Sequence, residues 1–159
     1  MYYHYTDKEL TYEKLEDRTE RLKSYEDLFK PIGLWISLGS EWKEFCDEEG
    51  FSTCNMNKLK TYEVEIKMDK IRVIDTYEKL EEFEEEYKIY MDDIKRYLID
   101  WVKVGQKYNG ILFNNYYEIK SKIMRSDKFN KYLWYYAIDV NSGCIWNPES
   151  IKSFKKIKL

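Results

Sequence analysis

The spacing of apolar residues divides the chain into short strands and a few helices. Between Lys60 and Thr76, residues Tyr62, Val64 and Ile66 alternate with charged residues, which predicts a strand with one buried face. Between Tyr77 and Tyr97, apolar residues recur every three or four positions and predict the main helix of the chain. Glutamates and lysines fill its other positions, as expected for a solvated helix face.

Aromatic and β-branched runs predict further strands near both ends of the chain. They are Met1–Thr6, Ile111–Phe113, Trp134–Asp139 and Ile151–Leu159. Within the first run, alternation places Tyr3 and Tyr5 on one face and Tyr2, His4 and Thr6 on the other. The whole pattern predicts six to seven short strands and two or three helices. That is an α+β fold, in a single domain covering residues 1–159.

The segment Lys30–Phe45 is the least ordinary part of the pattern. A Pro-x-Gly turn precedes a short apolar run, Ser and Gly residues interrupt the run, and a helix is predicted from Glu41 with Ser40 as its N-cap. A strand that leads into a helix N-terminus exposes backbone donors, which suit an anion or a ribose. A tight turn without a ligand is the alternative.

Composition narrows the classes of protein that fit. Of the 159 residues, 18% are aromatic, including sixteen Tyr, so an ordered core is expected. The formal net charge of −3 argues against sequence-independent binding to nucleic acid. Three cysteines and one histidine give neither a zinc site nor a disulfide framework. No apolar run approaches the length of a membrane span, so a soluble, cytoplasmic protein is expected.

The motifs of several enzyme classes are absent from the sequence. There is no Gly-x-Ser-x-Gly elbow and no phosphate-binding Gly-rich loop, and Cys46 and Cys144 lie in apolar patterns. Polar residues with aromatic neighbours recur at the ends of the predicted strands. These segments are His4–Thr6, Trp35–Ser37, Asn114–Glu118 and Asp139–Asn147. Such groups suit a flat heterocycle with a sugar. Simple packing of the rings is the alternative.

Several of these segments, in this order, resemble the ADP-ribosyltransferase fold of the diphtheria-toxin-like branch. Tyr3–Thr6 stands where that branch has a Tyr-His-Gly-Thr type motif, and Gly33–Ser37 matches its Gly-Leu-aromatic-x-Ser segment. Tyr62–Ile66, Tyr108–Ile111 and Ser142–Ile151 fit its later strands and closing segment. The resemblance implies a split antiparallel β-sheet core and NAD as the substrate.

The resemblance also implies roles for residues of the first two motifs. His4 and Thr6 would hold the ribose of NAD, and Trp35 or a nearby tyrosine would stack on the nicotinamide. Ser37 would orient the ribose. Tyr5 occupies the position where glycine is usual, beside the backbone that clamps the carboxamide.

The family's catalytic glutamate would fall near Ser142, where this chain has no carboxylate. Glu118 or Asp139 is then the candidate carboxylate, and the clusters around Tyr116 and Asn147 offer further groups to the nucleotide. The implied activity is transfer or hydrolysis of ADP-ribose from NAD. The alternative is a non-catalytic module on the same scaffold that binds a nucleotide or a protein partner.

Overall fold

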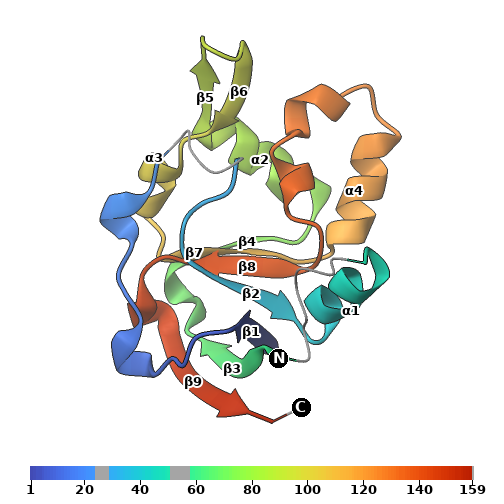
Figure 1. The fold of residues 1–159 in the computed structure, drawn as a ribbon. Coiled ribbons are helices and arrows are strands. Elements are labelled where there is room, and N and C mark those ends of the chain that lie inside the picture. Colours follow the sequence, from blue (N-terminus) through green and yellow to red (C-terminus); the bar gives the residue numbers. More distant parts are fainter. Residues whose placement is uncertain (24–28, 51–57, 159) are drawn as a thin grey trace.

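The computed structural model describes residues 1–23, 29–50 and 58–158, and a seven-stranded sheet runs through its centre (Figure 1). The strand order is β4-β7-β8-β2-β1-β3-β9, and two further strands, β5 and β6, form a hairpin. The strands are β1 (Tyr2–Thr6), β2 (Leu34–Leu38), β3 (Lys60–Ile66), β4 (Ile71–Ile74), β5 (Lys88–Met91), β6 (Arg96–Ile99), β7 (Gly110–Phe113), β8 (Ser142–Ile145) and β9 (Ile151–Ile157).

Four α-helices and several single 3-10 turns connect the described strands. The helices are α1 (Glu41–Glu48), α2 (Tyr77–Tyr87), α3 (Trp101–Gly105) and α4 (Tyr116–Met124). The 3-10 turns include η1 (Tyr12–Lys14), η2 (Thr19–Arg21), η5 (Phe129–Tyr132) and η6 (Tyr135–Ala137). Side-chain caps fix two helix starts, because Thr76 Oγ1 accepts from Lys79 N at 3.2 Å and Asp100 Oδ1 accepts from Lys103 N at 3.1 Å.

The sheet is antiparallel except for the pair β4 and β7, which is parallel. The expectation of a wholly antiparallel core is therefore wrong for this pair. The chain leaves β4 through α2, the hairpin and α3, and this long connection returns it in the same direction. The described residues thus form a small α+β domain with a mostly antiparallel sheet.

Strands β1 and β2 separate after a short paired segment. Only Tyr2 with Leu38 and Tyr3 with Ser37 are paired between them, whereas all five residues of β1 pair with β3. β1 therefore continues beside β3 while β2 continues beside β8, and the space between β1 and β2 widens toward Thr6.

The two faces of the sheet carry cores of different character. Aromatic residues fill the larger core, under α2, α3, α4 and the η5–η6 segment, and its fully buried rings include Phe83, Trp101, Phe113, Trp134 and Trp146. The smaller core on the other face is mainly aliphatic and contains Ile36, Val64, Leu112, Ile145 and Ile151. Successive side chains of β2 point to opposite faces of the sheet, so Trp35 packs on the larger core and Ile36 belongs to the smaller core.

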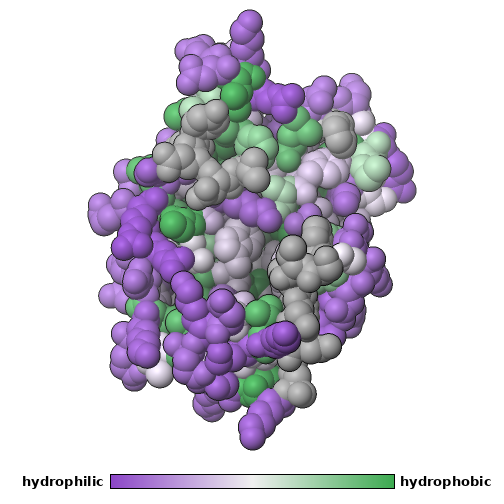
Figure 2. Space-filling view, in the orientation of Figure 1, coloured by the Kyte–Doolittle hydropathy of each residue, from purple (hydrophilic) through white to green (hydrophobic). Residues whose placement is uncertain are grey.

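Hydrophilic side chains cover most of the face shown in Figure 2, and they are dense over the N-terminal turns η1 and η2. Among the described residues, no helix is both long enough and apolar enough to cross a membrane.

The main helix is shorter than the sequence predicts, because α2 ends at Tyr87 and residues 88–99 form the β5–β6 hairpin. The hairpin projects from the body of the molecule (Figure 1). Tyr90 and Tyr97 are paired across it, with ring centroids 5.2 Å apart. Their spacing fits a helix, but in the structure it reflects cross-strand pairing of aromatic residues.

The strand predicted for Trp134–Asp139 is also absent, since this segment contains η6 and lies over the larger core. Trp134 and Tyr135 are both buried, so no polar face remains to show an alternation. The described residues contain nine strands and four α-helices, more of each than predicted. The Ser, Thr, Asn and Met residues of Phe51–Leu59 predict a loop, and most of this segment lies outside the described residues.

A buried carboxyl group interrupts the aromatic core. Glu84, on α2, is 1% exposed, and its Oε2 accepts from Trp134 Nε1 at 2.6 Å. Oε1 has no hydrogen-bond partner among the described residues. Burial raises the pKa of Glu84 above its usual 4.5, and the bond from Trp134 opposes this only in part.

Glu84→Gln is expected to raise the free energy of unfolding at pH 7. Because the pKa of Glu84 is raised in the folded state, the stability contributed by its protonated form is complete below pH 4.5 and declines as the pH rises through the folded-state pKa. Glutamine keeps an acceptor for Trp134 and does not ionise. Urea unfolding from pH 4 to pH 8 should show the gain shrinking toward pH 4, and a gain that is the same at every pH would contradict this explanation. Glu82→Gln, at an exposed position of the same helix, is the control.

Candidate functional site

A cavity of about 240 Å³ lies beside the point where β1 and β2 separate. It opens on the sheet face that carries the aromatic core, between the sheet, α1 and the loop that precedes β8. Its lining includes Tyr3, Tyr5, Trp35, Ser37, Trp42 and Ser142. We call this space the first cavity.

Strand register brings three of these lining residues into one row across the sheet. Tyr3 on β1 is paired with Ser37 on β2, and Ser37 is paired with Ser142 on β8. Both serines are buried, at 4% exposed. Ser142 Oγ donates to Val140 O at 3.0 Å, whereas Ser37 Oγ has no hydrogen-bond partner among the described residues. A buried hydroxyl that lines a cavity without a partner is suited to bind a polar group of a ligand.

His4 lies between the separating strands and borders the first cavity. Its Nδ1 is 2.7 Å from Trp35 O, and because a carbonyl oxygen can only accept, Nδ1 carries the proton. Its ring lies 6.5 Å from the ring of Tyr62 and 6.4 Å from that of Phe154, on the face of the aliphatic core. The His4 side chain thus replaces a strand-to-strand bond where β1 and β2 no longer pair.

Burial lowers the pKa of His4 below its usual 6.5, and the bond to Trp35 O opposes this in part. The ring is therefore neutral at pH 7, and Nε2 is an acceptor. Nε2 makes no hydrogen bond with any residue in the part of the chain that the structure describes.

The carboxylate of Asp139 lies beside the first cavity. Its neighbours Ile138 and Val140 line the cavity, as does Lys30, whose Nζ is 3.7 Å from Asp139 Oδ2. Burial raises the pKa of Asp139, and the Lys30 ammonium opposes this. Asp139 has a φ of 70°, a left-handed conformation that is uncommon for a residue other than glycine and that clusters at functional sites.

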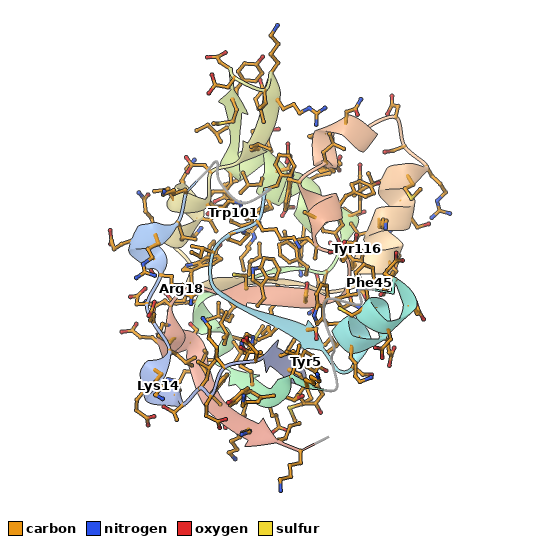
Figure 3. All side chains as sticks on the ribbon, in the orientation of Figure 1. Tyr5, Lys14, Arg18, Phe45, Trp101 and Tyr116 are labelled. Carbon is orange, nitrogen blue, oxygen red and sulfur yellow. The ribbon has the colours of Figure 1, made fainter. Side chains whose placement is uncertain are left out.

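Besides Asp139, which lies next to the lining, four predicted site residues lie outside the first cavity. Glu118 projects from α4 and its carboxylate is 3.5 Å from Lys122 Nζ, with 68% of the side chain exposed. Tyr116 is fully buried in the aromatic core, and Figure 3 shows it on α4, away from Tyr5. Asn147 caps a 3-10 turn by accepting from Glu149 N at 3.0 Å. Thr6 lines a different cavity, described below.

The structure adds residues to the site that the sequence did not single out. Lys30 and Trp42 line the first cavity, and Lys30 Nζ lies 5.4 Å from the centre of the Trp35 ring. Trp42 belongs to an apolar stripe along one face of its helix. Such a stripe predicts a core residue and gives no sign of a cavity. Lys30 is the first residue of the unusual segment Lys30–Phe45, and this position is the sign in the sequence that could have identified it as a site residue.

Glu41 and Asn141 form a second unpredicted feature, next to Ser142. Glu41 accepts from Asn141 N and Nδ2, each at 3.0 Å, and Asn141 Oδ1 accepts from Tyr116 N at 2.8 Å. The starts of α1, α4 and β8 are therefore fastened together. This contact fixes the position of Ser142 at the edge of the first cavity.

Ser37→Ala is expected to raise the free energy of unfolding by about 1 kcal/mol, because a buried hydroxyl without a partner costs about 1–3 kcal/mol. Ser142→Ala is a matched control on the neighbouring strand, and it should lower that free energy by about 1 kcal/mol, since it removes a made hydrogen bond. Chemical denaturation of both variants measures the difference. Equal losses would show that Ser37 Oγ has a partner in solution.

No described residues form a group of three or more His, Cys, Asp or Glu side chains placed to hold a metal ion. Comparison with protein-family models, with curated proteins and with solved structures finds no significant match to this chain.

Proposed function

We propose that this protein binds NAD in the first cavity and transfers or hydrolyses its ADP-ribose group. One observation carries the proposal: His4, Tyr5, Trp35, Ser37 and Ser142, from three distant segments, all line one cavity. The resemblance to ADP-ribosyltransferases names these residues and also Thr6, which lines a different cavity. A cavity of about 240 Å³ is smaller than typical sites for whole ligands of drug size, at about 300–1,000 Å³, so it suits the nicotinamide end of a dinucleotide.

The polar groups of the cavity fit a ring that carries a sugar. Trp35 offers an aromatic face, and stacking on such faces favours flat heterocycles. Ser37 Oγ can bind a carboxamide or a hydroxyl. The neutral His4 ring lies toward the opposite face of the sheet, at the gap between β1 and β2, so a ribose that extends into this gap can donate a hydroxyl hydrogen bond to Nε2. Tyr5, which stands where the family motif usually has the smaller glycine, also lines the cavity.

The proposed reaction breaks the bond between ribose C1′ and the nicotinamide nitrogen. The electron pair of that bond leaves with nicotinamide, which becomes neutral, and positive charge develops on the ribose. Water or an acceptor group then forms the new bond to C1′ and releases a proton. A carboxylate near C1′ stabilises the developing charge, and Asp139 is our candidate for it, since Ile138 and Val140 on either side of it line this cavity.

A second candidate function is binding of NAD or ADP-ribose without cleavage. Among the described residues no carboxylate lines the first cavity itself, and Asp139 is engaged with Lys30. Ser142 occupies the position at which the family's glutamate is expected. Such a protein would sense or sequester the nucleotide.

Release of free nicotinamide from NAD by the purified protein, measured beside Asp139→Asn, separates the two functions. Release that is lost in the variant, with NAD binding retained, supports cleavage by way of Asp139. Binding without release by the wild-type protein supports the second function. Absence of both binding and release would refute the proposal.

A further inference from the structure

A second cavity, of about 330 Å³, lies on the other side of His4. It is enclosed by the end of β1, the N-terminal segment that contains η1, and the start of β2. His4 borders both cavities, and Ile145 and Ile151 of the aliphatic core form the floor of the second. The gap between β1 and β2 thus lies between two cavities of different character.

The second cavity is positively charged in a chain that is negative overall. Lys8, Lys14 and Arg18 line it against one carboxylate, Glu16, while the whole chain has a formal net charge of −3. Glu16 Oε2 is 3.2 Å from Arg21 Nη1, outside the cavity, and 4.0 Å from Arg18 Nε, so the two arginines share its charge. Two of the cations, Lys8 and Lys14, make no ion pair with any described residue.

The polar groups around these lysines are held in place. Arg18 N donates to Trp146 O at 2.7 Å and Arg18 Nη1 donates to Gly33 O at 3.4 Å, which fixes the guanidinium against the start of β2. Thr6 Oγ1 accepts from Lys8 N at 3.2 Å, so its own O–H remains a donor. In Figure 3, Lys14 and Arg18 both extend from the N-terminal segment.

We propose that the second cavity binds a phosphate group of a nucleotide-type ligand. Two lysines without partners, an anchored arginine and a hydroxyl donor match the charge and the many acceptor oxygens of a phosphate or diphosphate. The phosphate comes either from NAD itself, reaching past His4, or from a separate phosphorylated acceptor. That the ligand is a nucleotide rests on the proposed function, whereas binding of a phosphate group rests on the residues that line the second cavity.

Calorimetric titration with inorganic pyrophosphate tests the cavity without NAD. The double variant Lys8→Gln, Lys14→Gln removes the two unpaired cations, and Lys155→Gln, Lys158→Gln removes the same charge from exposed positions of β9 and its end. We expect the first variant to bind pyrophosphate about tenfold more weakly than the wild-type protein and the control to bind within about twofold. Thermal unfolding should be unchanged in both, because these lysines are exposed.

Wild-type protein that does not bind pyrophosphate, or equal weakening in both double variants, would overturn the proposal. Titrations with NAD then identify the source of the phosphate. If the phosphate belongs to NAD, the first variant also binds NAD more weakly and pyrophosphate competes with NAD. If it belongs to a separate acceptor, NAD affinity is unchanged and both ligands bind together. Lysine-dependent pyrophosphate binding without NAD binding would refute the proposed function and leave the phosphate site standing.

Discussion

His4→Ala is expected to lower kcat/KM for NAD on the order of 100-fold, the largest functional effect that we predict for one residue. The change removes the acceptor Nε2 from the proposed ribose site, and a hydrogen bond of this kind contributes about 0.5–1.5 kcal/mol. It also leaves Trp35 O without its donor at the point where β1 and β2 separate. An unsatisfied buried carbonyl costs about 1–3 kcal/mol, and its relaxation would move Trp35. Nicotinamide release at several NAD concentrations measures the effect.

His4→Asn separates the two contributions of this histidine. The asparagine Nδ2 can replace Nδ1 as the donor to Trp35 O, but it offers no acceptor in the place of Nε2. We therefore expect the Asn variant to unfold at nearly the wild-type temperature and to turn over NAD as slowly as the Ala variant. Wild-type turnover by His4→Asn would exclude the role of Nε2 and leave His4 a structural residue.

Gly143→Ala is expected to lower the free energy of unfolding by about 2–3 kcal/mol, since overpacked positions of this kind typically cost about 1–3 kcal/mol. A methyl group on Gly143 would lie 2.4 Å from Leu112 Cδ2 and 2.7 Å from the backbone oxygen of Ile111. The side chain of Leu112 can turn away, but the backbone of β7 cannot without loss of its pairing with β8. Because Ser142 is the next residue, the shift should also weaken ligand binding in the first cavity. Urea denaturation and NAD titration measure the two effects.

Gly105→Ala is the matched control for this clash. Its new methyl group would also meet a close atom, Leu22 Cδ1 at 2.4 Å, but the other neighbours are 3.8 Å away and no backbone atom is involved. The end of the leucine side chain can move, and alanine favours the helical conformation of α3. The cost should stay below about 1 kcal/mol. Similar losses in the two variants would show that backbone contact is not the cause.

The parts of the site that lie on strands could be predicted from the sequence. Tyr5, Trp35 and Ser37 occur in short motifs, and strand alternation fixes which face each side chain occupies. Their convergence on one cavity depends on β1 and β2 being neighbours in the sheet, which the sequence does not state. The α+β class followed from local patterns in the same way.

The failures in the predicted fold have a common physical origin. Tyr90 and Tyr97 are seven residues apart, a spacing that fits two helical turns and a hairpin pair equally well. Trp134 and Tyr135 are buried because the whole segment packs on the aromatic core, so hydrophobicity reports burial there and not a strand. In both segments contacts with another part of the chain decided the conformation, across the hairpin in the first and with the aromatic core in the second.

Long-range charge contacts were the least predictable part of the site. Glu118 and Asp139 are equally acidic in the sequence, but Glu118 pairs with Lys122 on an exposed helix face and Asp139 pairs with Lys30 beside the cavity. The i,i+4 spacing of Glu118 and Lys122 indicates the first pair, whereas Asp139 and Lys30 are distant along the chain. Spacing alone carries no information about such contacts.

Titration of NAD into the wild-type protein and into Ser37→Val, followed by calorimetry, is the most direct test of NAD binding in the first cavity. Valine replaces the unpartnered hydroxyl of Ser37 with a methyl group and adds a second methyl beside the first cavity, so the fold should persist while the proposed NAD contact is lost. We predict saturable binding of one NAD by the wild-type protein, weakened at least about tenfold in the variant. No binding by the wild-type protein, or equal affinity in the two proteins, would contradict the account.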